Sequence, residues 1–104
     1  MKKDNYKTDV IFRREYTGMF KDDIIAVFPY VINDFKGGVL SYMHVGQHSG
    51  MDYDCVINGT KPAKENEYQA LKSELESIGY NLNIVKRRNY KRYLAELNKI
   101  RQRV

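Results

Sequence analysis

The stretch from Ala63 to Ile78, AKENEYQALKSELESI, decides the fold class of this 104-residue chain. Glu65 and Glu67 fall in its first turn, where acidic side chains interact favourably with a helix dipole. Gly79 follows at the position where a left-handed residue commonly ends a helix. Four apolar residues recur at the spacing of one helix face: Tyr68, Leu71, Leu75 and Ile78. We therefore expect an amphipathic helix that covers an apolar surface.

The residues before this helix supply such a surface in three β-rich runs, which are Thr8–Tyr16, Ile24–Val31 and Val39–Val45. The connections between them are short, and Asn33-Asp34 and Gly37-Gly38 have the composition of a turn. Short connections favour antiparallel neighbours, so we expect a three-stranded antiparallel meander. Residues 46–60 contain three glycines and little periodicity, which predicts a long loop with Val56-Ile57 as a short pairing segment.

Two further elements follow the central helix. Asn81–Lys86 is predicted as a fourth strand, and Tyr90–Arg103 as a second helix capped by Asn89. The order of elements is β, β, β, α, β, α, which predicts an α+β fold built as a two-layer α/β sandwich. The connection through the first helix is long enough for a crossover, so the fourth strand could lie parallel to a neighbour.

Length and composition indicate a single domain spanning residues 1–104, with a polar N-terminal tail at residues 1–7. The single cysteine, Cys55, provides no internal disulfide framework. The N-terminal residues are polar, and the longest apolar run, Ile24–Ile32, is far below the ~20 residues of a membrane helix. We expect a cytoplasmic protein that does not insert into a membrane.

Three motifs carry a resemblance to a known family: YxHxGQH at residues 42–48, Pro62-Ala63, and EYxxLxxELESIGYxL at residues 67–82. Together with Phe28-Pro29, they resemble a family of small uncharacterised proteins found in bacterial genomes, plasmids and phages. The resemblance spans residues 10–88 and implies a mobile-element context. It implies no activity, ligand or catalytic residue, but it supports treating His44, Gly46, Gln47 and His48 as a unit. The segment 89–104 lies outside it.

The segment Ser41–Cys55 holds both histidines and the only cysteine. His44 and His48 are candidate catalytic residues together with Asp52 and Asp54, either as an acid and base pair or as metal ligands. Ligating rings must converge on one point about 2.0 to 2.1 Å away, whereas residues four apart on a continuous strand are about 13 Å apart. Convergence therefore requires a turn at Gly46.

The spacing matches no metal signature, so we expect no metal and no cofactor and favour two structural histidines. Cys55 is a weaker candidate for a nucleophile, because the sequence places no histidine beside it. A small hydrolase or metal-dependent enzyme that uses the His44/His48 loop remains the alternative function.

The net charge of +5 is distributed unevenly along the chain. Residues 1–31 carry a net charge of +1, residues 32–79 carry −3, and residues 80–104 carry +7. If Asn89 caps the terminal helix, cations crowd its N-terminus and interleaved tyrosines are available to stack on unpaired bases. The candidate binding residues are Lys86, Arg87, Arg88, Tyr90, Lys91, Arg92 and Tyr93.

The sequence therefore predicts a small basic binding protein without enzymatic activity. Its C-terminal segment, residues 86–103, would contact nucleic acid or an acidic protein partner. The alternative without a binding role is a solvated basic face, with Tyr90 and Tyr93 anchoring the helix. Homodimerisation through the exposed sheet edge or the terminal helix is a further alternative.

Overall fold

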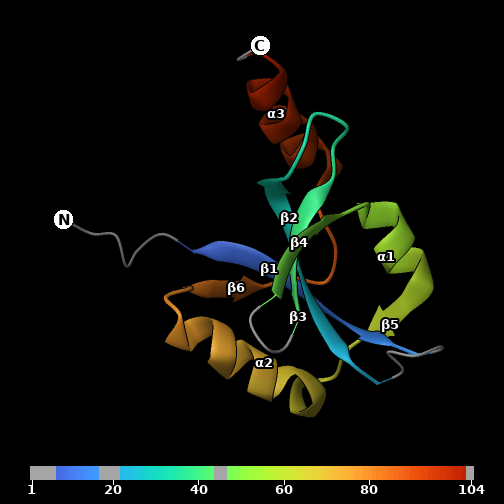
Figure 1. The fold of residues 1–104 in the computed structure, drawn as a ribbon, viewed down its shortest axis with the longest axis vertical. Helices are drawn as coiled ribbons and strands as arrows, with labels where there is room; N and C mark the ends of the chain where they lie inside the picture. Colours follow the sequence, from blue (N-terminus) through green and yellow to red (C-terminus); the bar gives the residue numbers. More distant parts are fainter. Residues whose placement is uncertain (1–6, 17–21, 44–46, 103–104) are drawn as a thin grey trace.

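A computed structural model of the chain describes residues 7–16, 22–43 and 47–102 (Figure 1). The elements are β1 (Thr8–Glu15), β2 (Ile24–Ile32), β3 (Val39–Met43), β4 (Gln47–Met51), α1 (Tyr53–Gly59), β5 (Thr60–Pro62), α2 (Glu65–Ser77), β6 (Leu82–Ile84) and α3 (Tyr90–Arg101). The predicted α+β class and the C-terminal helix are confirmed.

The strands form one sheet in the order β4-β3-β2-β1-β5. The pairs β1–β2 and β2–β3 are antiparallel, so the predicted meander is confirmed, and β4 extends it by one more antiparallel strand. The strand after α2, β6, pairs in parallel with the start of β1. β5 pairs antiparallel with the end of β1. The outer edge of β1 is thus covered by β6 and β5, which lie one after the other along it.

The helix α2 covers one face of this sheet. Leu71 is 5% exposed and Leu75 is fully buried, and they pack on alternate residues of the strands. The strand residues on this face are Val10, Phe12, Ala26, Phe28 and Tyr42. The hydroxyl of Tyr42 donates to the carboxylate of Glu74 on α2, which ties the helix to β3.

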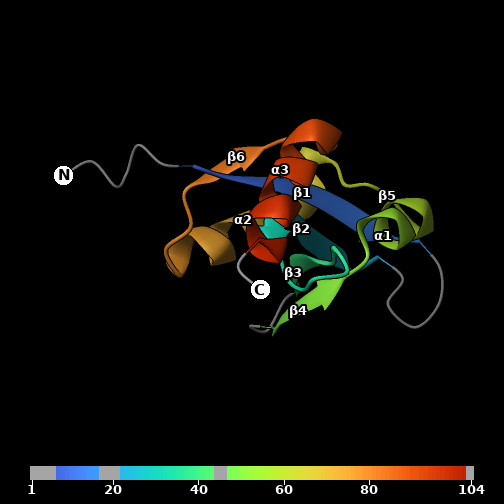
Figure 2. The ribbon, with the colours of Figure 1, turned by 90° about the horizontal axis from the view of Figure 1, so that it is seen from above.

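The opposite face is covered by α1 and α3. Its core consists of the intervening strand residues Ile11, Ile25, Val27 and Val39, packed with Tyr53 and Val56 of α1 and with Tyr93 and Leu97 of α3. Figure 1 shows α3 and α2 at opposite ends of the molecule, and Figure 2, seen from above, shows α3 lying over the sheet. The structure therefore adds a third layer to the two-layer sandwich that we expected, because the central strands are apolar on both faces.

The prediction of a long loop at residues 46–60 was wrong. This segment contains β4, the short helix α1 and the short strand β5. Val56 and Ile57, which we expected to pair as a strand, lie inside α1. Asp52 caps this helix by accepting a hydrogen bond from the Cys55 amide at 3.1 Å, and Tyr53 and Val56 bury its inner face. A helix of only seven residues carries too little periodicity to be recognised from the sequence.

One residue of the central helix was also assigned to the wrong face. Ile78, expected in the core, is the C-cap of α2 and is 54% exposed. Gly79 behaves as expected, since its φ of +114° lies in the left-handed region that ends helices. Among the described residues, no helix has the combination of length and apolar content needed to cross a membrane.

Candidate functional site

The strands β3 and β4, which lie on either side of residues 44–46 in the sequence, pair as a β-hairpin. The backbone of His48 lies in β4 opposite Tyr42 of β3, and Met43 pairs with Gln47, so the chain reverses between these two strands. His44 lies outside the described residues, so neither the two structural histidines that we expected nor the alternative in which His44 and His48 converge is tested. Within the described residues, no three side chains of the types that ligate metals come together to hold an ion.

Both candidate aspartates belong to α1. The carboxylate of Asp52 caps the helix, and Asp54 in its first turn lies 3.8 Å from Nη2 of Arg88. Cys55 on the same turn is exposed. A hydrogen bond to Asp52 and its negative charge raise the pKa of the Cys55 thiol, which lowers its thiolate fraction at neutral pH. These contacts give the two aspartates and Cys55 local roles in α1.

Arg88, in the link between β6 and α3, is held by aromatic rings. Its guanidinium carbon lies 4.1 Å from the ring centroid of Tyr53 and 4.0 Å from that of Tyr93. A third ring, that of Tyr90, is 5.3 Å away. Only 11% of the Arg88 side chain is exposed, so this cation joins α1 to α3 and is not available to an external anion.

Arg92 and Tyr93 are also engaged within the fold. Arg92 donates to the Asp9 carboxylate at 3.1 Å and stacks over the ring of Tyr30 at 4.0 Å. Tyr93 is 7% exposed, and its hydroxyl donates to the Gly37 carbonyl at 2.6 Å. Tyr93 therefore anchors α3 to the fold, as the alternative without a binding role predicts for this residue.

The remaining candidates of the C-terminal segment are exposed. Lys86, Arg87 and Lys91 form no ion pair with the described residues, and Tyr90 is 59% exposed. Asn89 caps α3 as expected, because its side chain accepts a hydrogen bond from the Arg92 amide at 3.0 Å. We call Lys86, Arg87, Tyr90 and Lys91 the basic link.

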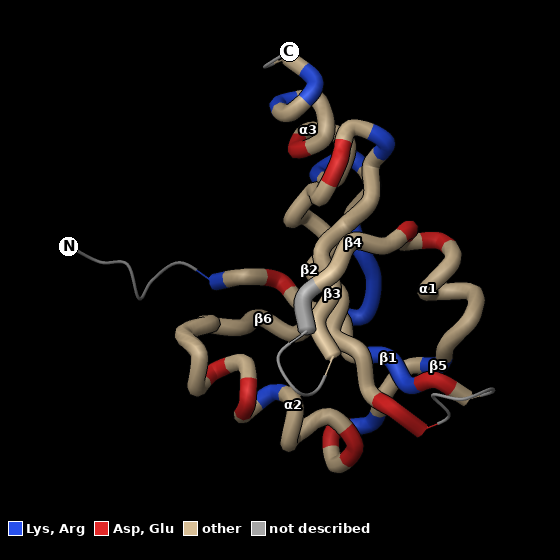
Figure 3. Tube along the Cα trace, viewed as in Figure 1, with Lys and Arg blue, Asp and Glu red and all other residues tan. Residues whose placement is uncertain are grey.

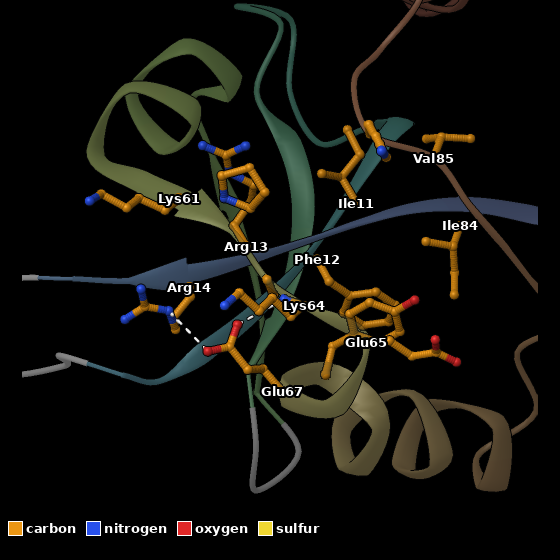
Figure 4. Close-up of a pocket in the computed structure, with 14 residues that line it drawn as sticks. Ile11, Phe12, Arg13, Arg14, Lys61, Lys64, Glu65, Glu67, Ile84 and Val85 are labelled. Atoms are coloured by element: carbon orange, nitrogen blue, oxygen red, sulfur yellow. Dashed lines mark hydrogen bonds and ion pairs between the residues drawn. The ribbon is translucent and has the colours of Figure 1, made fainter.

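A groove that the sequence did not predict opens beside the basic link. It has a volume of about 630 Å³ and lies along the outer edge of β1, where β5 and β6 follow one another (Figure 4). The start of α2 closes one side of it, and Lys86 borders it, so groove and basic link are continuous. Because its walls come from three separate segments of the chain, no local pattern could have indicated it.

The groove is lined by more cations than anions. Its cationic residues are Arg13, Arg14, Lys61, Lys64 and Lys86, and its anionic residues are Glu65 and Glu67. Figure 3 shows that these basic positions come from β1, β5, the start of α2 and the basic link. Glu67 is already engaged, since it accepts from the Lys64 amide at 2.8 Å and lies 3.4 Å from Nε of Arg14.

The five groove cations are not equally available. Arg13 is 8% exposed and donates to Thr60 and to the Ile57 carbonyl, and burial lowers its pKa from the ordinary value. Arg14 is paired with Asp22 at 3.0 Å. Lys61, Lys64 and Lys86 have no ion-pair partner among the described residues, and Nζ of Lys61 lies 5.0 Å from the ring centroid of Tyr16. Unlike Arg88, Lys61 is exposed, so its charge stays accessible. These three lysines give the groove its available positive charge.

Comparisons with known proteins give no assignment: no protein-family model, curated protein or solved structure matches the chain.

Proposed function

We propose that this protein binds single-stranded nucleic acid and has no enzymatic activity, with the basic link and the lysines of the adjoining groove as its contact surface. The observation that carries this proposal is the selective pairing of the C-terminal cations. Arg88 and Arg92 are engaged by rings and carboxylates, whereas Lys86, Arg87 and Lys91 are exposed without a partner among the described residues.

Unpaired cations concentrated on one surface favour a polyanion, because each phosphate that they neutralise releases condensed counterions. Tyr90, which precedes Lys91 at the start of α3, is 59% exposed. A base that is not held in a duplex can stack on such a ring, and this arrangement favours a single strand. An acidic protein would engage the same cations but would gain less from the ring.

The experiment measures the binding of fluorescently labelled single-stranded DNA and RNA by fluorescence anisotropy at two salt concentrations. With about three phosphates neutralised, affinity should fall about tenfold to twentyfold between about 50 mM and 200 mM salt. The triple variant Lys86→Glu, Arg87→Glu, Lys91→Glu should lose at least about tenfold in affinity at the lower salt concentration.

A charge-matched control separates the basic link from net charge. The variant Lys7→Glu, Lys36→Glu, Lys99→Glu changes the net charge by the same amount at exposed positions outside the link and the groove. It should retain most of the affinity. Absence of binding to either nucleic acid at about 50 mM salt, or equal losses in the two triple variants, would refute the proposal. Binding of an acidic protein in place of the oligonucleotides would point to the other class of partner.

A further inference from the structure

We infer that the groove along the outer edge of β1 holds one unpaired base of the bound strand, with the neighbouring phosphates on its lysines. This inference rests on the proposed function and assigns the base to a place within that surface. It requires a groove of adequate size, an apolar wall, available cations and continuity with the basic link.

The size and position of the groove meet the first and last requirements. Its volume of about 630 Å³ falls within the range of about 300 to 1,000 Å³ that small-molecule sites occupy. Lys86 belongs both to the lining of the groove and to the basic link. A strand that lies on Arg87 and Lys91 therefore reaches the groove without crossing an uncharged surface.

One part of the groove is apolar and includes aromatic rings. Phe12 and Tyr68 stack with centroids 4.5 Å apart and planes inclined by 9°. Phe12 is 4% exposed and Tyr68 is half-buried, so Tyr68 is the outer ring of the pair. A base placed against this ring would extend the stack by a third planar group.

The β6 wall adds an apolar side chain that the core does not account for. Ile84 lines the groove, is 38% exposed, and belongs to neither core cluster. In Figure 4, Ile84 and Val85 lie at one end of the groove, and Arg14 and Lys61 lie at the other. Lys86 follows Val85 in the sequence and also lines the groove, so cations flank the apolar wall on the side of the basic link as well. A nucleotide in a strand, which carries a flat base and has a phosphate on either side, matches this arrangement.

The charged end has cations that are available to bind a phosphate. Lys61 and Lys64 are exposed, and the groove carboxylate of Glu67 is already satisfied by the Lys64 amide and by Arg14. Glu65 accepts a hydrogen bond from Gln69 at 3.1 Å. The balance of available charge in the groove is therefore positive.

The test compares three labelled probes of equal length: a single strand, a single strand whose bases are replaced by abasic residues, and a duplex. Electrostatic contacts act on all three, whereas the groove and the ring of Tyr90 act only on an unpaired base. We expect the normal single strand to bind at least about fivefold more tightly than the abasic strand, as one stacked base contributes. The duplex should also bind more weakly than the normal strand.

Two matched variants locate the effect in the groove. Ile84→Ser removes the exposed apolar wall, and Val31→Ser removes a side chain of similar exposure, 40%, from β2 outside the groove. Ile84→Ser should weaken binding of the normal strand about fivefold and leave the abasic strand unaffected. Val31→Ser should change neither. Because both positions are exposed, both variants should fold, which circular dichroism verifies.

The outcomes of the two proposals are distinguishable. If no probe binds, the proposed function fails and the groove assignment fails with it. If the normal strand binds more tightly than the abasic strand but Ile84→Ser and Val31→Ser behave alike, the base stacks elsewhere, as on Tyr90, and the groove assignment alone is overturned. If all probes bind alike, the protein reads only phosphates, and both the groove assignment and the preference for a single strand are overturned.

Discussion

Gly37 and Tyr93 meet at a contact that a side chain at residue 37 would destroy. Gly37 has a φ of +99°, and a Cβ atom built on it would lie 2.2 Å from the Tyr93 hydroxyl oxygen. The same hydroxyl donates to the Gly37 carbonyl, so this turn between β2 and β3 anchors α3. The glycine is needed both for its backbone conformation and for the close approach of a ring from another element.

We predict that Gly37→Ala lowers the free energy of unfolding by at least about 2 kcal/mol, from backbone strain and the displaced hydroxyl together. Gly79→Ala is the control, because its φ is also positive but its Cβ would meet open space. It should cost only about 1 kcal/mol. Urea denaturation measures both.

A double variant checks the mechanism of this contact. In a Tyr93→Phe background the clashing oxygen is absent, and the next ring atom lies 3.5 Å from the position that the alanine Cβ would take, which is an ordinary contact. Gly37→Ala should then cost about as much as Gly79→Ala. Equal costs of Gly37→Ala in both backgrounds would show that the hydroxyl is not responsible.

Sequence reasoning about the site was least complete at the level of single residues. Composition correctly located the positive charge at the C-terminal end, but it could not separate Arg88 from Arg87. Arg88 is held by Tyr53, which is distant in the sequence and becomes its neighbour only when α1 packs beside α3. The availability of a cation is therefore a tertiary property.

Among the elements, the short helix α1 depends on a contact from β1. Arg13 donates from Nε to the Thr60 hydroxyl at 2.9 Å and from Nη2 to the carbonyls of Ile57 at 2.9 Å and Thr60 at 2.7 Å. These acceptors lie at the C-terminal end of α1, where a helix leaves carbonyl groups without internal partners. A buried arginine thus completes a helix too short to be stable alone.

We predict that Arg13→Met lowers the free energy of unfolding by about 2 to 3 kcal/mol, because it leaves these buried acceptors without a donor. Lys36→Gln, at an exposed turn position, should stay within about 0.5 kcal/mol of the parent protein. Urea denaturation with matched transition slopes measures the difference. Similar stabilities of the two variants would contradict the role of Arg13.

At the level of elements, a helix or strand was predicted where its local sequence pattern is strong and missed where that pattern is weak. The three strands of the meander, α2 and α3 were predicted because their periodicity and caps are local. β4, α1 and β5 were missed because their local patterns are weak and each is stabilised by partners elsewhere: β4 by β3, α1 by Arg13, and β5 by the end of β1. The groove was not predicted because it forms only where β1, β5, β6 and the start of α2 come together in the tertiary structure.

On the scale of the whole molecule, α3 packs on the same sheet as the other elements and is not an appendage to it. Tyr93 and Leu97 are 7% and 4% exposed and pack on the strands of the face opposite α2. Removing two such side chains costs about 2 to 5 kcal/mol each, which is comparable to the total stability of about 5 to 15 kcal/mol of a small domain.

We therefore predict that a chain ending at Arg88 loses cooperative unfolding, whereas a chain ending at Gln102, which retains all of α3, unfolds like the full-length protein. Near-ultraviolet circular dichroism of the tyrosines and urea denaturation check both chains. A cooperative transition in the chain ending at Arg88 would show that residues 7–88 form a domain without α3.

Because Thr8–Val10 pair with Leu82–Ile84, this edge of the sheet can be completed only after residues 82–84 have been synthesised. β1 is synthesised before β2 and can form a hairpin with it at once, but half of its other edge stays open until residues 82–84 have also emerged. An incomplete nascent chain therefore exposes an apolar strand with free hydrogen-bonding groups. Other nascent chains that are translated from the same messenger RNA can pair with this strand. Truncated translation products of this protein should be more prone to aggregate than the finished chain, and more dependent on chaperones.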